Sequence, residues 1–266
     1  MKSIYRYLGE IRSTMSDFDS FVFLFNSPDI SIWKSDHDPL SQVYNFASRH
    51  LNDCEDHKAA LNRLISLKTI FDGAMLIFFN ENYLCHEVRI TNFDGISIYL
   101  DQSDVDITVN PFSETYIDEY LPKEIYCDLD KARVPRTIFL SRYDQVTRDI
   151  LKYVGYQKLS YITLYAIKDW LIKNGWDTNR ILKETGWSNS TFKRFTYTAN
   201  TPHHLGPYCR HGGTSHAERA PDPLPLHEAT QPILLALRAF LNERFFKKNI
   251  EGIIKGNIHP PIDTTK

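Results

Sequence analysis

Apolar residues recur every three or four positions through most of the chain after Pro135, and this helical period is the feature that most restricts the fold. The clearest run is Leu159–Asn174, which ends at the stop signal Asn174-Gly175. Asp177 and Ser188 stand where the N-caps of two shorter helices are expected. The pattern predicts helices over 144–154, 159–174, 178–185, 189–196 and 226–248.

The chain before Pro135 shows a mixture of periods. Lys58–Phe71 has helical spacing, with Asp56 near its start and Gly73 as the expected end, and the residues between 39 and 52 also suggest a helix. Short apolar or alternating runs predict strands, and Asn92-Phe93-Asp94-Gly95 predicts a hairpin turn between two of them. The expected strands are 21–25, 74–79, 85–91, 96–100 and 105–109.

These patterns predict an α+β protein. We expect a mixed N-terminal domain over residues 1–135, with antiparallel strands, followed by an all-helical domain over residues 136–266. At 42% hydrophobic residues, the 266-residue chain has enough apolar surface for a substantial core.

The cysteines and the hydropathy restrict the setting in which the protein works. The four cysteines are far apart and form no CxxC pair, which favours reduced thiols. The first residues have no apolar core with a cleavage site, and no run approaches the ~18 apolar residues of a membrane span. We therefore expect a soluble, cytoplasmic protein with no membrane partner.

The charge is distributed unevenly along the chain. Residues 1–139 carry 13 Lys and Arg against 22 Asp and Glu, a net charge of −9, whereas residues 140–255 carry 17 against 10, a net charge of +7. This asymmetry is typical of a basic region that faces a polyanion, and it is equally consistent with attraction between the two halves.

A histidine-rich stretch, Thr185–His227, interrupts the helical pattern. It contains Arg210, His211 and His216, together with further histidines, glycines and prolines. Imidazole and guanidinium groups on one long loop suit proton transfer or phosphate chemistry. The alternative is a solvated surface loop whose histidines have no chemical role.

Arg210 and His216 are spaced as in the R-x(4–6)-H motif, and the region resembles the HEPN-domain ribonucleases, which often act as toxins or antiviral effectors. The resemblance implies metal-free RNA cleavage, with Arg210 stabilising the phosphorane charge and His216 or His211 exchanging protons. Gly212-Gly213 departs from the family pattern because it weakens a helix. The phrase FTYTANTP and the residues after it also resemble bacterial proteins of unknown function.

Residues Asn179–Phe195 resemble a DNA-reading helix-turn-helix. Gly186 makes the turn, Trp187 packs beneath it, and Phe192 and Phe195 face inward. The outer face then presents groups suited to bases and phosphates, namely Asn189, Ser190, Thr191, Lys193 and Arg194. The alternative is an ordinary pair of short helices.

We expect no metal and no cofactor. The loop has ligand types for zinc, but their spacing matches no zinc signature, and the acidic cluster Asp101, Asp104 and Asp106 lacks the glycine of a cation loop. The leading hypothesis is a nucleic-acid-directed protein of bacterial or phage defence that acts on RNA or DNA, with ribonuclease activity as its sharpest form. The alternatives are a DNA-binding module without catalysis and a structural or sensor subunit of a defence complex. The protein could act as a homodimer or with a partner protein.

Overall fold

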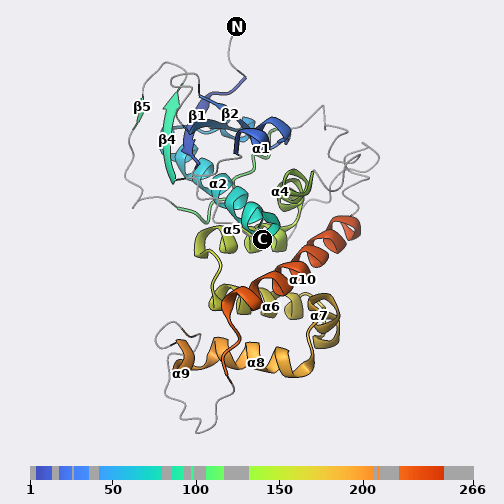
Figure 1. Cartoon of the computed structure of the whole chain (residues 1–266). Coiled ribbons are helices and arrows are strands. Elements are labelled where there is room, and N and C mark those ends of the chain that lie inside the picture. The colour runs from blue at the N-terminus through green and yellow to red at the C-terminus, as the bar shows by residue number, and fades with distance from the viewer. Residues whose placement is uncertain are drawn as a thin grey trace.

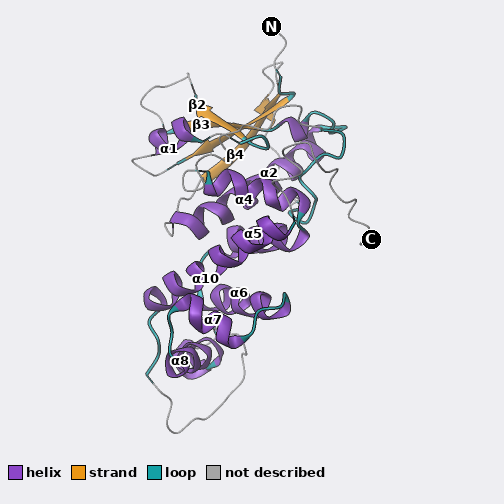
Figure 2. Cartoon of the chain, turned by 90° about the vertical axis from the view of Figure 1, so that its right-hand side faces the viewer, coloured by secondary structure: helices purple, strands orange, loops and turns teal. Residues whose placement is uncertain are grey.

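The protein has an α+β fold with a small sheet at one end and helices over the rest of its length (Figures 1 and 2). The computed structural model describes residues 4–13, 18–25, 27–35, 42–79, 86–92, 97–98, 106–116, 132–205, 209 and 222–248. None of the helices within these ranges is long and apolar enough to cross a membrane.

The sheet is antiparallel, with strand order β2-β3-β1-β4-β5. Residues of β1 and β3 alternate between the core and the outer face, and Tyr7, Ile11, Tyr44 and Phe46 point into the core. The strands are β1 (Tyr7–Arg12), β2 (Ser31–Lys34), β3 (Val43–Ala47), β4 (His86–Asn92) and β5 (Ser97–Ile98).

Helix α2 (His57–Phe79) lies against the sheet and crosses α5 (Gln145–Gln157) at very short range. Two glycines make this approach possible. A Cβ atom built at Gly73 would lie 2.0 Å from the Leu151 carbonyl oxygen, and one built at Gly155 would lie 1.9 Å from the Thr69 carbonyl oxygen. Both positions therefore require glycine because the neighbouring backbone occupies the space of a side chain.

The helices between Tyr161 and Leu205 build the other end of the molecule, whereas α4 lies beside α2 and α5, and α10 runs between the two ends (Figure 1). Asp144, Ser160, Asp177 and Ser188 each accept a hydrogen bond at a helix N-terminus, which explains where α5, α6, α7 and α8 begin. The bounds are α4 (Arg133–Tyr143), α6 (Tyr161–Lys173), α7 (Thr178–Thr185), α8 (Asn189–Asn200), α9 (Pro202–Leu205) and α10 (Leu226–Lys247), with α1 (Phe18–Leu24) and the 3-10 helix η1 (Arg49–Leu51) beside the sheet.

A partly buried ion pair joins α10 to the junction of α4 and α5. Arg244 donates from Nε and Nη2 to the two carboxylate oxygens of Asp144, at 2.6 and 2.5 Å. Burial alone would raise the pKa of Asp144, but the hydrogen bonds from Arg244 and Thr147 outweigh it and hold the pKa below its ordinary value. Asp144 thus caps α5 and anchors α10 at once.

Several sequence predictions for the first half are wrong. Residues 74–79 continue α2 as a helix, because Gly73 serves the crossing with α5 and does not end the helix. Residues 21–25 fall mainly in α1, whose Phe18 and Phe21 pack inward at helical spacing, and 105–109 contains no strand within its described residues 106–109. The helix expected between 39 and 52 is instead β3 followed by η1.

The second half agrees well with its helical period. All the predicted helices after residue 144 are present, although α5 continues through Gly155 to Gln157 and α8 extends to Asn200. In the first half, β4 confirms the strand expected at 85–91. The division at residue 135 remains a prediction, and one continuous core contains residues from both sides of it.

Candidate nucleic-acid interface

Helices α7 and α8 are joined by a three-residue turn, Gly186–Ser188, which is the connection expected of a helix-turn-helix. Gly186 has a φ of +68°, in the left-handed region. No atom lies within 4 Å of a Cβ built there, so the backbone angle and not the available space favours glycine.

Ser188 begins α8. Its Oγ accepts a hydrogen bond of 3.1 Å from the Thr191 N–H, and it also contacts the hydroxyl groups of Ser190 and Thr191 at 2.7 and 2.9 Å. The side chain satisfies a donor at the helix N-terminus that would otherwise face water. The predicted cap is therefore confirmed, and Asn189 and Ser190 in the first turn of α8 are exposed.

The inner face of the pair is apolar. Ile181 of α7 and Phe195 of α8 are fully buried, and Phe192 is partly buried against the same core. The Trp187 ring lies 5.2 Å from the Phe195 ring, as the sequence predicted for a residue packed beneath the turn. Helix α8 packs on α6, and α7 packs on α6 and α10, so the polar residues of α8 face outward.

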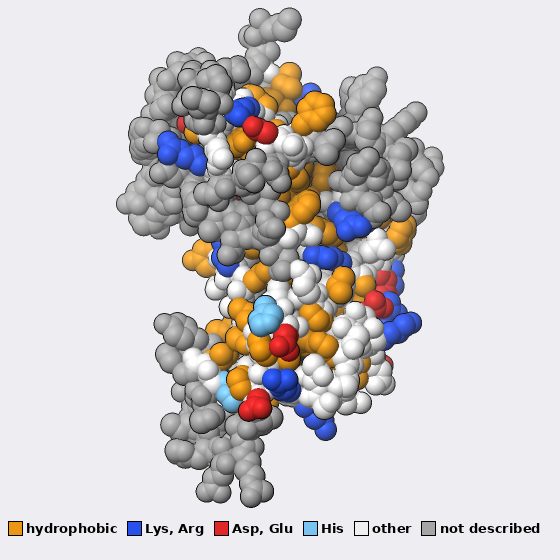
Figure 3. All heavy atoms as spheres, viewed as in Figure 1, with side chains coloured by type: hydrophobic (Ala, Val, Ile, Leu, Met, Phe, Trp, Pro, Cys, Tyr) orange, Lys and Arg blue, Asp and Glu red, His pale blue; other side chains and the backbone are white. Residues whose placement is uncertain are grey.

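The outer face contains most of the residues that the sequence assigned to nucleic-acid binding. Asn189, Ser190 and Lys193 are exposed, and Thr191 is half-buried. Figure 3 shows mainly polar, uncharged groups with a few basic side chains at the lower right, over α7 and the start of α8. Amide and hydroxyl groups suit base edges, and an ammonium group suits a phosphate.

Arg194 has a different position from the other predicted residues. Its guanidinium donates to the carbonyl oxygens of Asp222 and Pro223, at 2.6 and 2.8 Å. The Thr198 hydroxyl accepts a hydrogen bond of 3.0 Å from the N–H of the buried Leu224 in the same segment. Arg194 therefore holds the chain that leads into α10, a contact that sequence spacing did not indicate.

The predicted catalytic residues Arg210, His211 and His216 lie outside the described residues. Of their neighbours, Cys209 is buried at 5% exposure, and the ring of His204 contacts Tyr197 edge to face at 5.6 Å. Asp101 and Asp104 also lie outside the described residues. Among the side chains that the structure does describe, no three of His, Cys, Asp or Glu gather as metal ligands.

The structure reveals a buried histidine network that sequence reasoning missed. His50 Nδ1 accepts the Ser113 N–H at 3.1 Å, so Nε2 carries the hydrogen and donates to Asp29 at 2.9 Å. Both His50 and Asp29 have no exposed surface, and Arg142 lies 3.6 Å from the same carboxylate. Both ring nitrogens are therefore engaged, and the network joins η1 to Asp29 and Ser113 in the interior.

Asp53 completes the polar contacts around this network. Its carboxylate accepts hydrogen bonds from Arg63, Ser113 and Thr115. Burial would raise the pKa of Asp53, but these hydrogen bonds outweigh it and lower the pKa. Ser113 and Thr115 are 60 and 62 positions from Asp53 in the sequence. No local sequence pattern therefore revealed these contacts.

Comparison of the chain with models of protein families, with curated proteins and with solved structures found no match. The function is therefore inferred from the residues of this chain alone.

Proposed function

We propose that this protein binds double-stranded DNA, with the start of α8 in the major groove and α7 against the backbone. The observation that carries the proposal is the Gly186–Ser188 turn, which combines a left-handed glycine with a capped second helix. In helix-turn-helix proteins the residues at the N-terminus of the second helix contact the base edges. Here those positions are Asn189 and Ser190, both exposed.

The chemistry of the face supports contact with a duplex. An Asn amide can pair in a bidentate manner with adenine, and Ser or Thr hydroxyls contact either bases or phosphates. Lys193 lies one turn further along α8 and is exposed, so it is the natural contact for a phosphate. Arg194, which binds the Asp222 and Pro223 carbonyls, positions the segment behind the helix.

The test is the salt dependence of binding to a mixed-sequence duplex, measured by fluorescence anisotropy at several salt concentrations. Lys193→Ala should weaken binding and reduce the slope of log affinity against log salt by about one, the value for one lost phosphate contact. Lys58→Ala is the matched control, because Lys58 is exposed at the start of α2 near the sheet and carries the same charge.

Two results would count against the proposal. An unchanged slope in Lys193→Ala would mean that this face does not meet the DNA backbone. An equal loss in Lys58→Ala would mean that binding follows net charge and has no defined site. Asn189→Ala is the companion variant, and it should cost about 1–3 kcal/mol for preferred sequences only, because a base contact is lost.

RNA cleavage by Arg210 with His211 or His216 is the alternative that the sequence resemblance suggests. It is tested by incubating the full chain with RNA in EDTA and examining the ends, which should carry 2′,3′-cyclic phosphate. Arg210→Ala should then abolish cleavage and leave the melting temperature unchanged. The defence role and the sensor-subunit role remain predictions from the sequence.

A further inference from the structure

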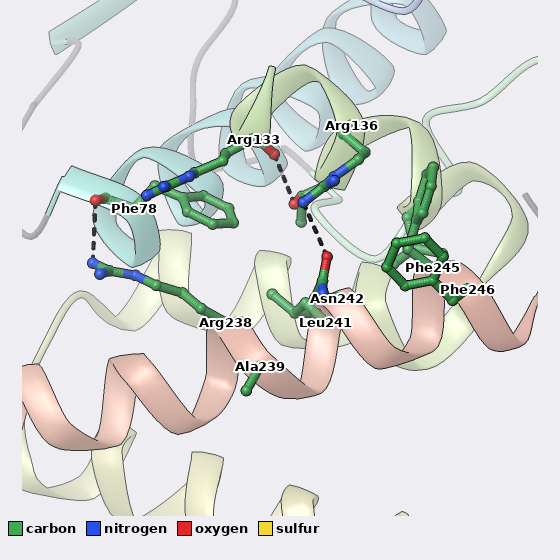
Figure 4. Close-up of a pocket in the computed structure, with 11 residues that line it drawn as sticks. Phe78, Arg133, Arg136, Arg238, Ala239, Leu241, Asn242, Phe245 and Phe246 are labelled. Atoms are coloured by element: carbon green, nitrogen blue, oxygen red, sulfur yellow. Dashed lines mark hydrogen bonds between the residues drawn. The ribbon is translucent and has the colours of Figure 1, made fainter. Parts of the chain in front are cut away.

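The last turns of α10 contact both ends of the molecule. On the side toward α4 and the end of α2, α10 lines a pocket of 350 Å³, the α4–α10 pocket (Figure 4). Three arginines line this pocket, Arg133, Arg136 and Arg238. Figure 4 shows Arg136 and Asn242 directed toward each other, and Arg136 Nη2 donates to Asn242 Oδ1 at 3.1 Å. Arg238 Nε donates to the Ile77 carbonyl oxygen at 2.7 Å, so α10 is fixed on both α4 and α2.

Glu243 lies on another side of α10, toward α7. Its Oε2 accepts a hydrogen bond of 3.1 Å from Nε1 of Trp176, just before α7, and Lys247 pairs with its Oε1. Arg180 Nη2 of α7 lies 3.8 Å from Oε2. The hydrogen bond from Lys247 outweighs partial burial and lowers the pKa of Glu243, so this carboxylate is charged at neutral pH. Glu243 therefore has two partners besides Arg180.

Arg180 belongs to the exposed side of α7. Ile181 and Thr185 are buried in the core. Arg180 and Lys183 are three residues apart and both exposed, so they share the outer side of the helix. Arg180 Nε lies 2.9 Å from Glu184 Oε1, one turn further along α7. Two carboxylates, one on α7 and one on α10, thus hold the Arg180 guanidinium.

The lysines of the α7–α8 surface differ from Arg180 in this respect. Among the described residues, neither Lys183 nor Lys193 has an ion-pair partner. The pairs of Arg180 are exposed, and an exposed ion pair stabilises a protein only slightly because water screens both charges. A phosphate offers a guanidinium two oxygens in bidentate geometry, which is a stronger contact. A DNA backbone at this surface can therefore replace the glutamates as the partner of Arg180.

We propose that Arg180 is a phosphate contact of the DNA site, and that Glu184 and Glu243 hold it back in the free protein. This inference rests on the proposed binding of DNA by α7 and α8. On binding, Arg180 exchanges the two carboxylates for a backbone phosphate, while Glu243 keeps its contacts with Trp176 and Lys247. Because the exchange breaks existing ion pairs, the two glutamates lower the affinity for DNA and set how tightly the protein binds.

The experiment is a double-mutant cycle of Arg180→Ala and Glu184→Gln in the full chain. Binding to a mixed-sequence duplex is measured by fluorescence anisotropy at several salt concentrations. Glu184 is the chosen carboxylate because its ion-pair partner is Arg180, whereas Glu243 also holds Trp176. Arg180→Ala should weaken binding and reduce the slope of log affinity against log salt by about one. Arg180→Lys should keep the slope, because it retains the charge.

Glu184→Gln should tighten binding roughly two- to fivefold, because Arg180 then gives up one ion pair fewer. In the Arg180→Ala background the same change should have little effect, since the two side chains act as a unit. Glu55→Gln is the matched control, because Glu55 is exposed before α2 and its replacement removes the same charge. It should leave the affinity unchanged, and the melting temperature of each variant checks its fold.

Three results would overturn the inference. The first is an unchanged salt slope in Arg180→Ala while Lys193→Ala reduces it, which removes Arg180 from the site and leaves DNA binding by α8 standing. The second is tighter binding by Glu184→Gln that persists in the Arg180→Ala background, which means that the carboxylate only repels DNA. The third is a protein that binds no duplex at any salt concentration, which overturns the proposed function as well.

Discussion

The crossing of α2 and α5 and the turn between α7 and α8 both depend on glycine, but for opposite reasons. At the crossing, Gly73 and Gly155 leave room for the backbone of the other helix, at 2.0 and 1.9 Å from where a Cβ would stand. At the turn, Gly186 has open space around it and a φ of +68°. The first region is controlled by packing and the second by backbone conformation, so the same substitution should have different effects in each.

The largest effect is expected for Gly155→Ala. In an exposed helix this change stabilises by roughly 0.5–1 kcal/mol, because alanine favours the helix. Here the new Cβ would overlap the Thr69 carbonyl oxygen, which belongs to the backbone of α2 and cannot rotate away. We expect a loss of about 3 kcal/mol or more, at the upper end of overpacking costs, measured by urea unfolding.

Gly73→Ala tests the same crossing from the other helix, since its Cβ would overlap the Leu151 carbonyl oxygen. The double variant should lose less than the sum of the two single losses, because one separation of α2 from α5 relieves both overlaps. If Gly155→Ala is more stable than the original protein, α2 and α5 can move apart to accept the new Cβ atom. Close packing would then not be the reason for glycine at this position.

Gly186→Ala should have a smaller effect, about 1–2 kcal/mol, because alanine is strained in the left-handed region and no clash is added. Gly186→Asn should recover part of this loss, since asparagine tolerates that conformation. If Asn and Ala are equally destabilising, the backbone angle is not the cause. The same pair of variants, titrated with DNA, shows whether the turn geometry matters for binding.

The smallest effect on stability is expected at Lys152, which lies in α5, one of the two helices of the crossing. Its Nζ donates to the Ile107 and Val109 carbonyl oxygens at 3.0 and 2.7 Å. Burial, followed by the charge of Arg148, lowers the pKa of Lys152 from 10.5 to about 8. The unfolded chain therefore keeps this proton between about pH 8 and 10.5, while the folded protein has released it.

Stability must then rise with pH across that window, because the unfolded state binds more protons. We expect Lys152 to add roughly 1 kcal/mol to the free energy of unfolding across this pH window, after screening by solvent. Below about pH 8 it should not change how the free energy of unfolding depends on pH. Lys152→Met should remove the rise, whereas Lys173→Met, at an exposed position of α6, should keep it. Urea unfolding at several pH values measures both, and an unchanged slope in Lys152→Met would contradict the assignment.

The sequence predicted the second half of the molecule well because its signals are local. Asp177, Ser188 and Asn174-Gly175 bracket short helices, and each cap involves residues only a few positions apart. The apolar positions of α7 and α8 share the same period, so the buried and exposed faces of the pair followed from spacing alone. Asn189, Ser190 and Lys193 were therefore placed correctly on the outer face.

The predictions failed where a residue's role depends on a distant partner. Gly73 was interpreted as a helix end because nothing nearby in sequence reveals that Leu151 occupies its side-chain space. The contact that Arg194 makes was missed because the segment that it holds, at Asp222 and Pro223, is 28 and 29 residues away. The arginines of the α4–α10 pocket escaped notice for the same reason.

The chain by itself thus determined the helical second half, its caps and the polar face of α8, since these depend on period and on contacts within one or two turns. Only the tertiary structure decided that α2 continues past Gly73, that His50 is locked between Asp29 and Ser113, and that Arg133, Arg136 and Arg238 line one pocket. Each of these depends on which distant elements pack together, and packing is selected by the whole buried surface and not by any local pattern.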